Sequence, residues 1–77
     1  MNIAFIVGKN EKLSRVIQQF YLDRHYKWPS NQNKILYVDK PILFIQDDSK
    51  CITYRSYRSL YNSYLCREQP DIAIDLR

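Results

Sequence analysis

Apolar residues lie along the chain in short runs separated by polar turns, with two longer stretches at helical spacing. The run Asn2–Val7 is continuous and ends at Gly8, which predicts a buried strand. From about Glu11 to Tyr26, apolar residues recur every three or four positions, which predicts a helix with Asn10 as its N-cap. The residues expected on its apolar face are Leu13, Val16, Ile17, Phe20, Tyr21 and Trp28.

The middle of the chain contains short apolar segments that are typical of strands. These are Lys34–Val38, Pro41–Gln46 and Cys51–Tyr54, with a polar turn at Asp47–Lys50 before the last of them. Two arrangements fit this pattern. Either Ile42–Tyr54 forms a hairpin, or its two apolar halves lie apart in a mixed sheet.

The last third of the chain predicts an amphipathic helix followed by a strand. Ser56 is a suitable N-cap, the helix should end before Pro70, and Asp71–Leu76 should form the strand. On a helical projection Arg55 and Arg58 lie opposite an arc of tyrosines, which are Tyr54, Tyr57, Tyr61 and Tyr64. We expect this arc to pack on the sheet. The alternative is that some rings are exposed beside the arginines, as in surfaces that stack bases or bind proteins.

The predicted order of elements is β-α-β-β-β-α-β, in one domain spanning residues 1–77. We therefore expect an α/β fold, with α+β as the alternative, built from a small mixed sheet of about four to five strands and two helices. A chain of this size buries only about 60% of its unfolded surface. It needs dense packing or association, and a homodimer is one solution.

The formal net charge is +4, which favours anionic partners such as nucleic acid, although solubility alone accounts for it equally well. The first apolar run is too short for a signal peptide or a membrane span. We therefore expect a cytoplasmic protein without membrane contact. In that reducing compartment Cys51 and Cys66 should be thiols.

Few residues suggest chemistry. Asp71 and Asp75 should point to the same side of the last strand, where paired carboxylates can bind Mg²⁺ or share a proton. Further acids near them are lacking, and His25 is expected on the surface. We therefore predict no catalysis, no metal and no cofactor, and treat the aspartate pair only as the weakest alternative.

The last third of the chain also resembles the part of a P-loop helicase or terminase-type motor lobe that leads into the Walker B strand. Ile52–Ser56 and Asp71–Asp75 follow the rhythm of that family, and Gly8–Leu13 is similar to a neighbouring strand-and-helix unit. The 77 residues contain no phosphate loop, and Leu76 follows Asp75 where the family has a glutamate. The resemblance therefore implies a motor-lobe remnant without nucleotide hydrolysis.

The function that this sequence favours is a non-catalytic binding module that engages nucleic acid or a nucleic-acid-handling complex, as a small accessory protein of a virus or phage would. The predicted contact residues are Arg55, Arg58, Tyr57, Tyr61, Asn62, Lys9 and Arg15. The alternative is an inhibitor or adaptor that binds an acidic surface of a host enzyme. A metal-dependent nuclease is the least favoured reading.

Overall fold

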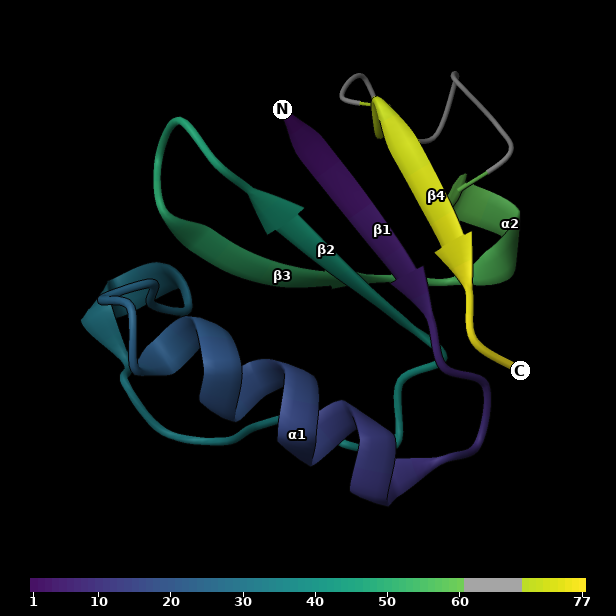
Figure 1. The fold of residues 1–77 in the computed structure, drawn as a ribbon, viewed down its shortest axis with the longest axis horizontal. Coiled ribbons are helices and arrows are strands. Elements are labelled where there is room, and N and C mark those ends of the chain that lie inside the picture. The colour runs from purple at the N-terminus through teal and green to yellow at the C-terminus, as the bar shows by residue number, and fades with distance from the viewer. Residues whose placement is uncertain (61–68) are drawn as a thin grey trace.

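A computed structural model describes residues 1–60 and 69–77 of the protein. It contains one mixed four-stranded sheet with helices, which confirms the predicted small α/β fold (Figure 1). The elements are β1 (Asn2–Ile6), α1 (Glu11–Leu22), the 3₁₀ turn η1 (Pro29–Asn31), β2 (Ile42–Gln46), β3 (Cys51–Arg55), α2 (Tyr57–Leu60) and β4 (Ile72–Asp75). Among the described residues, no helix has the length and apolar character needed to cross a membrane.

The strand order is β3-β2-β1-β4, so the first strand of the chain lies inside the sheet. β1 pairs with β2 antiparallel and with β4 parallel, and β2 pairs with β3 antiparallel. The antiparallel pair β2–β3 confirms the hairpin and excludes the arrangement in which its halves lie apart. β3 and β4 are the two edge strands, as Figure 1 shows.

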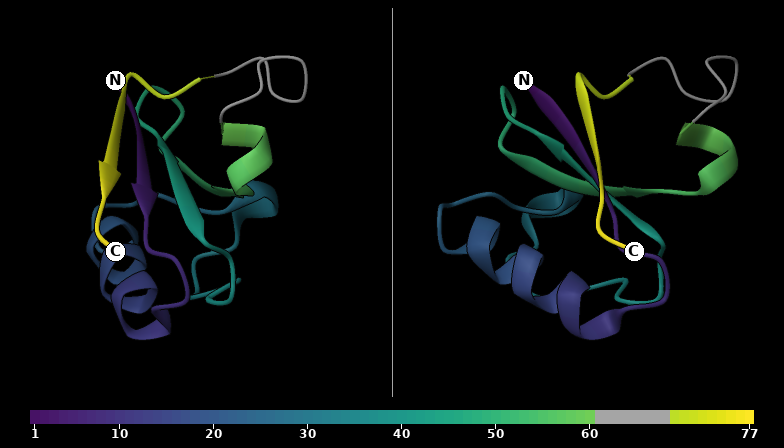
Figure 2. Two further views of the ribbon diagram at one scale, coloured as in Figure 1. Left: turned by 90° about the vertical axis from the view of Figure 1, so that its right-hand side faces the viewer. Right: turned by 45° about the vertical axis from the view of Figure 1, so that its right-hand side comes forward.

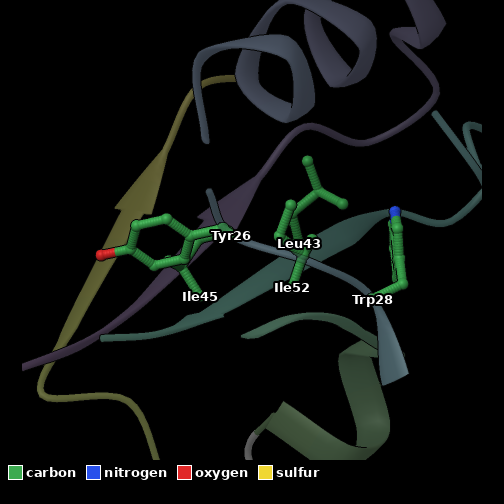
Figure 3. Close-up of a cluster of buried hydrophobic side chains, with 5 residues drawn as sticks. All are labelled: Tyr26, Trp28, Leu43, Ile45 and Ile52. Atoms are coloured by element: carbon green, nitrogen blue, oxygen red, sulfur yellow. The ribbon is translucent and has the colours of Figure 1, made fainter. Parts of the chain in front are cut away.

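α1 and α2 lie on opposite sides of the sheet (Figure 2), and buried apolar residues of the strands form two clusters. Towards α1, Leu43, Ile45 and Ile52 form a buried cluster with Tyr26 and Trp28. Figure 3 shows Tyr26 and Trp28 on either side of Leu43 and Ile52. A second cluster lies on the other face of the sheet, because its residues alternate along the strands with those of the first. It consists of Ala4, Ile6, Ile42 and Phe44.

α1 is shorter than predicted and turned about its axis. It begins at Glu11 with Asn10 as its cap, as expected, because the Asn10 side chain accepts the Leu13 N–H at 3.0 Å. It ends at Leu22 instead of Tyr26. The chain reverses at His25, where φ is +68°, and this lets the following residues reach β3.

The fully buried residues of α1 are polar, which corrects part of the predicted apolar face, whereas Ile17 and Tyr21 of that face do pack against the buried cluster. Ser14 and Gln18 are fully buried, whereas Val16 and Phe20 are 65% and 48% exposed. Trp28 is buried but lies outside the helix. Gln18 faces inwards because its amide binds the backbone N–H and C=O of Leu36, which are not paired with a strand.

Lys34–Val38, predicted as a strand, is irregular. Gln18 binds its backbone instead, since Leu36 donates its N–H to Gln18 Oε1 at 2.9 Å and Gln18 Nε2 donates to the Leu36 carbonyl at 2.7 Å. Tyr37 then adopts a positive φ of 52°, which extended strands do not contain. The sheet therefore has four strands.

The described part of the C-terminal third differs from its prediction at Tyr54. Tyr54 belongs to β3 and not to a helix, so it does not share a helical arc with Tyr57. Ser56 caps α2 as expected, with its Oγ accepting the Ser59 N–H at 3.1 Å. The rest of that predicted helix, including Tyr61, Asn62 and Tyr64, lies outside the described residues.

Candidate functional site

Three aromatic rings form a connected group at the β3 edge of the sheet, which we call the aromatic platform. It consists of Trp28, Tyr37 and Tyr54. The ring centroids of Trp28 and Tyr37 are 5.1 Å apart, and those of Tyr37 and Tyr54 are 4.9 Å apart. Trp28 is 3% exposed, but Tyr37 and Tyr54 are 46% and 41% exposed. A buried ring thus supports two rings that present large aromatic surfaces to solvent.

Backbone hydrogen bonds position the platform. Lys27 donates its N–H to the Lys50 carbonyl at 3.0 Å and accepts that of Ile52 at 2.9 Å, so the segment before η1 lies against β3. Trp28 closes the next turn by donating its N–H to the Gln32 carbonyl at 2.9 Å. On the other side, the Gln18–Leu36 hydrogen bonds hold the residue that precedes Tyr37.

A hollow of about 240 Å³ opens beside the platform. Its lining combines the aromatic rings with the polar side chains of Ser30, Gln32 and Thr53. Lys40 adds a cation, because its Nζ lies 5.1 Å from the centroid of the Tyr54 ring. The Lys40 ammonium takes up one approach to the Tyr54 ring and places a positive charge beside the platform.

A second hollow, of about 420 Å³, shares Trp28, Pro29 and Ser30 with the first. We call it the basic hollow, because its lining includes Lys27, Lys50 and His25 and no acidic side chain among the described residues. It is open, and its two lysines suit an anionic group.

Asp47, which lies two residues before the lining residue Ser49, is engaged elsewhere. Asp47 accepts a hydrogen bond of 2.5 Å from the Tyr26 hydroxyl and lies 3.5 Å from the ammonium group of Met1. This hydrogen bond and the Met1 ammonium lower the pKa of Asp47. The hydrogen bond to Asp47, together with burial, raises the pKa of Tyr26 to about 12, so the phenol is neutral at physiological pH.

The structure separates the contact residues that the sequence predicts. Arg55 lies opposite to Tyr54 in the pleat, with its guanidinium 4.2 Å from the centroid of the Phe44 ring. Tyr57 carries the Arg77 guanidinium over its ring at 5.2 Å, and Arg58 is exposed on α2. The remaining described members are exposed, Lys9 before α1 and Arg15 on it. Tyr61 and Asn62 are not described.

Asp71 and Asp75 each interact with a different neighbour. Asp71 Oδ2 accepts the Asn2 N–H at 2.7 Å. Asp75 accepts two hydrogen bonds from the Arg77 guanidinium, at 2.9 and 2.7 Å, which lower its pKa to about 2. Among the described residues, no group of three or more His, Cys, Asp or Glu side chains is arranged to hold a metal ion.

Sequence reasoning missed Trp28, Tyr37 and Lys40 as surface-forming residues. Trp28 looked like part of a helix face, and Tyr37 looked like part of a strand. The available signal was the position of Tyr37 and Lys40 in a polar connecting segment, where binding residues are common.

Comparison with protein-family models, with curated proteins and with solved structures found no match for this chain. The resemblance to a motor lobe therefore stays a prediction from its short motifs.

Proposed function

We propose that the protein is a non-catalytic module that binds single-stranded nucleic acid, with unpaired bases stacked on Tyr37 and Tyr54. The observation that carries this proposal is the aromatic platform, which exposes two connected rings above a buried tryptophan. Aromatic side chains stack on any base, so such a surface binds single strands with little sequence preference.

The charges next to the platform support the same partner. Lys40 lies over Tyr54, and the basic hollow with Lys27 and Lys50 adjoins the platform through Trp28. A strand whose bases stack on the rings would therefore have cationic side chains within reach of its phosphates. The net charge of +4 adds long-range attraction.

The test is the affinity of the protein for labelled single-stranded DNA and RNA, measured by fluorescence anisotropy. Removing one stacking ring by Tyr54→Ala should weaken binding roughly 5- to 150-fold, because a stacked base contributes about 1–3 kcal/mol. The matched control is Tyr57→Ala, which removes a tyrosine of similar exposure on the other side of the sheet. It should leave the affinity nearly unchanged.

The control also separates this site from the one that the sequence predicts. If Tyr57→Ala and Arg58→Ala weaken binding while Tyr54→Ala does not, the interface lies on α2 and the assignment of the binding site to the aromatic platform is wrong. If the folded protein binds neither DNA nor RNA at low salt, the proposed function itself is wrong.

Salt dependence tests the basic hollow. Each phosphate that a lysine neutralises contributes about 0.9 to the slope of log affinity against log salt for duplexes and about 0.7 for single strands. Lys50→Ala and Lys27→Ala should each reduce that slope, whereas Tyr54→Ala should lower the affinity and leave the slope unchanged. Equal slopes in all variants would exclude contact between phosphates and this hollow.

A further inference from the structure

The outer edge of β4 is unpaired among the described residues and is bordered by apolar side chains. β4 is the last strand in the order β3-β2-β1-β4. Ile72 and Leu76 are each 41% exposed. An apolar strand with an open edge is a ready template for another strand, and monomeric proteins generally protect such edges.

Hydrogen-bond parity identifies which backbone groups of β4 face outwards. Ile6 pairs with Asp75 in the parallel register, and the Ile6 carbonyl accepts the N–H of Leu76 at 2.9 Å. In a parallel ladder this directs the N–H and C=O of Ile74 towards β1. Those of Ala73 and Asp75 then point away from the sheet.

We propose that β4 pairs antiparallel with β4 of a second copy of this chain, with the two-fold axis at Ile74. In this register Ala73 lies opposite Asp75 of the other copy, and both outward-facing pairs of backbone groups are used. The result is four hydrogen bonds between the copies and one continuous eight-stranded sheet. This proposal does not depend on nucleic-acid binding.

Charge selects this register over its neighbours. If the pairing continues beyond the ends of β4 with the axis at Ile74, Asp71 of one copy lies opposite Arg77 of the other, twice, and the Arg77 guanidinium would then be shared with Asp75 of its own copy. Moving the axis to Ala73 would place Asp71 opposite Asp75, and moving it to Asp75 would place the two Asp75 side chains opposite each other. Like charges directly opposite destabilise strand pairs, whereas opposite charges stabilise them.

The apolar pattern fits the same arrangement. Ile74 is the register partner of Phe5, which packs on the α1 side of the sheet. Alternation places Ile72 and Leu76 on that side as well, and they would lie opposite each other across the axis. The two-fold axis is perpendicular to the sheet, so both α1 helices lie on one face of the joined sheet.

Exposed residues of α1 extend this apolar surface. Val16 and Phe20 line a hollow of about 320 Å³ together with Phe5, Ile17 and Tyr21. Stable interfaces bury about 1,200–2,000 Å² in total, more than a pair of short strands provides. The exposed apolar side of α1 is therefore the surface that would complete the interface.

Disulfide trapping tests the register directly. At the axis the two Ile74 residues form a non-hydrogen-bonded pair with Cα atoms about 4.5 Å apart, within the disulfide range of about 4.4–6.8 Å. Ile74→Cys should therefore give a covalent dimer under mild oxidation. The control Ile72→Cys should not, because its two copies are about 13 Å apart in this register.

The unaltered chain, which keeps Cys51 and Cys66, reports any bridging by the native thiols. Equal cross-linking of Ile72→Cys and Ile74→Cys, or none by Ile74→Cys, would overturn the register.

A charge-reversal cycle measured by analytical ultracentrifugation provides the second test. Asp71→Arg or Arg77→Asp alone should weaken the dimer, and the double variant should recover part of the loss. Within one copy these residues lie at opposite ends of the strand, about 20 Å apart, so recovery reports a contact between copies. Simple additivity of the two changes would contradict the contact.

The oligomeric state of the unaltered protein decides the proposal as a whole. It should show a concentration-dependent monomer–dimer equilibrium, and Ala73→Pro should abolish it by removing an outward-facing N–H. A monomer at every concentration would overturn the proposal. A dimer that persists in Ala73→Pro and in both charge-reversal variants would also overturn it. The same holds if the β4 edge pairs only with a strand of a different protein.

Discussion

Gln18 and Leu36 are joined by two hydrogen bonds, one in each direction, between a fully buried helix residue and the segment before the aromatic platform. Gln18 also donates to Ser14 Oγ at 3.1 Å. Ser14 and Gln18 form a buried polar stripe on α1. Through Gln18, this polar stripe supplies the hydrogen bonds that a neighbouring strand would otherwise provide to Leu36. This interaction links the helix to the position of Tyr37.

Gln18→Ala should destabilise the protein by about 2–3 kcal/mol, because it leaves the Leu36 N–H and C=O without partners. The free energy of unfolding in urea measures this loss. Gln19→Ala is the control, since Gln19 is exposed and bonds only Asp23 nearby, and it should change stability by less than about 0.5 kcal/mol. Equal losses in the two variants would show that the buried Gln18 amide contributes no more to the free energy of unfolding than the exposed Gln19 amide does.

The same substitution should affect binding at temperatures where the protein is still folded. Releasing Leu36 allows Tyr37 to leave its contact with Trp28 and Tyr54, so Gln18→Ala should weaken binding of single-stranded oligonucleotides. Anisotropy titration of the folded variant checks this. An unchanged affinity would mean that Tyr37 does not belong to the stacking surface.

Tyr26→Phe should lower the free energy of unfolding by less than Gln18→Ala does. It removes the hydrogen bond to Asp47 but retains the ring, which packs edge-on against Tyr21 with centroids 4.9 Å apart. Thermal unfolding followed by circular dichroism measures the change. A loss larger than that of Gln18→Ala would contradict the assignment of the polar stripe as the stronger interaction.

The alkaline limb of the stability curve should also report Tyr26. Its folded pKa of about 12 lies above the ordinary value of about 10. The extra stability is therefore complete below pH of about 10 and is lost as the pH rises towards about 12, because only the unfolded state releases the proton there. Urea unfolding across this range should show a shallower decline in Tyr26→Phe; identical declines would exclude the effect.

Gly8→Ala should destabilise the protein through its backbone. Gly8 has a φ of +61°, and a Cβ there would lie 3.2 Å from Arg77 Cγ. The positive φ costs about 1 kcal/mol for a residue with a side chain, and the contact adds to it unless Arg77 moves. Arg77→Ala in the Gly8→Ala background should recover only the part due to the contact. Full recovery in urea unfolding would show that backbone strain is negligible.

The parts of the fold that the sequence predicts are those governed by local patterns. Apolar runs identified the strands β1, β2, β3 and β4 to within a residue or two, and Asn10 and Ser56 marked the helix starts by their capping side chains. These signals depend on nearby residues only. The pairing of β1 with β4 depends on the whole chain, and no local pattern contains it.

The errors share a physical cause. Helical periodicity placed Val16 and Phe20 in the core, but the hydrogen-bonding needs of Leu36 turned Ser14 and Gln18 inwards instead. Tyr54 was placed in the predicted strand but was also counted in the helical arc, and because β3 continues to Arg55 the expected grouping of tyrosines and arginines does not form. Both outcomes depend on contacts between residues distant in the sequence, Gln18 with Leu36 and Leu43 with Tyr54, and such contacts leave no periodic trace.

The position of β1 inside the sheet has a consequence for the order in which the sheet can be completed. β1, β2 and β3 can pair with one another without β4, which adds only to the other side of β1. Until it does so, that side of β1 is open to β4 of the same chain or of another copy, so β4 is the strand most open to exchange between copies.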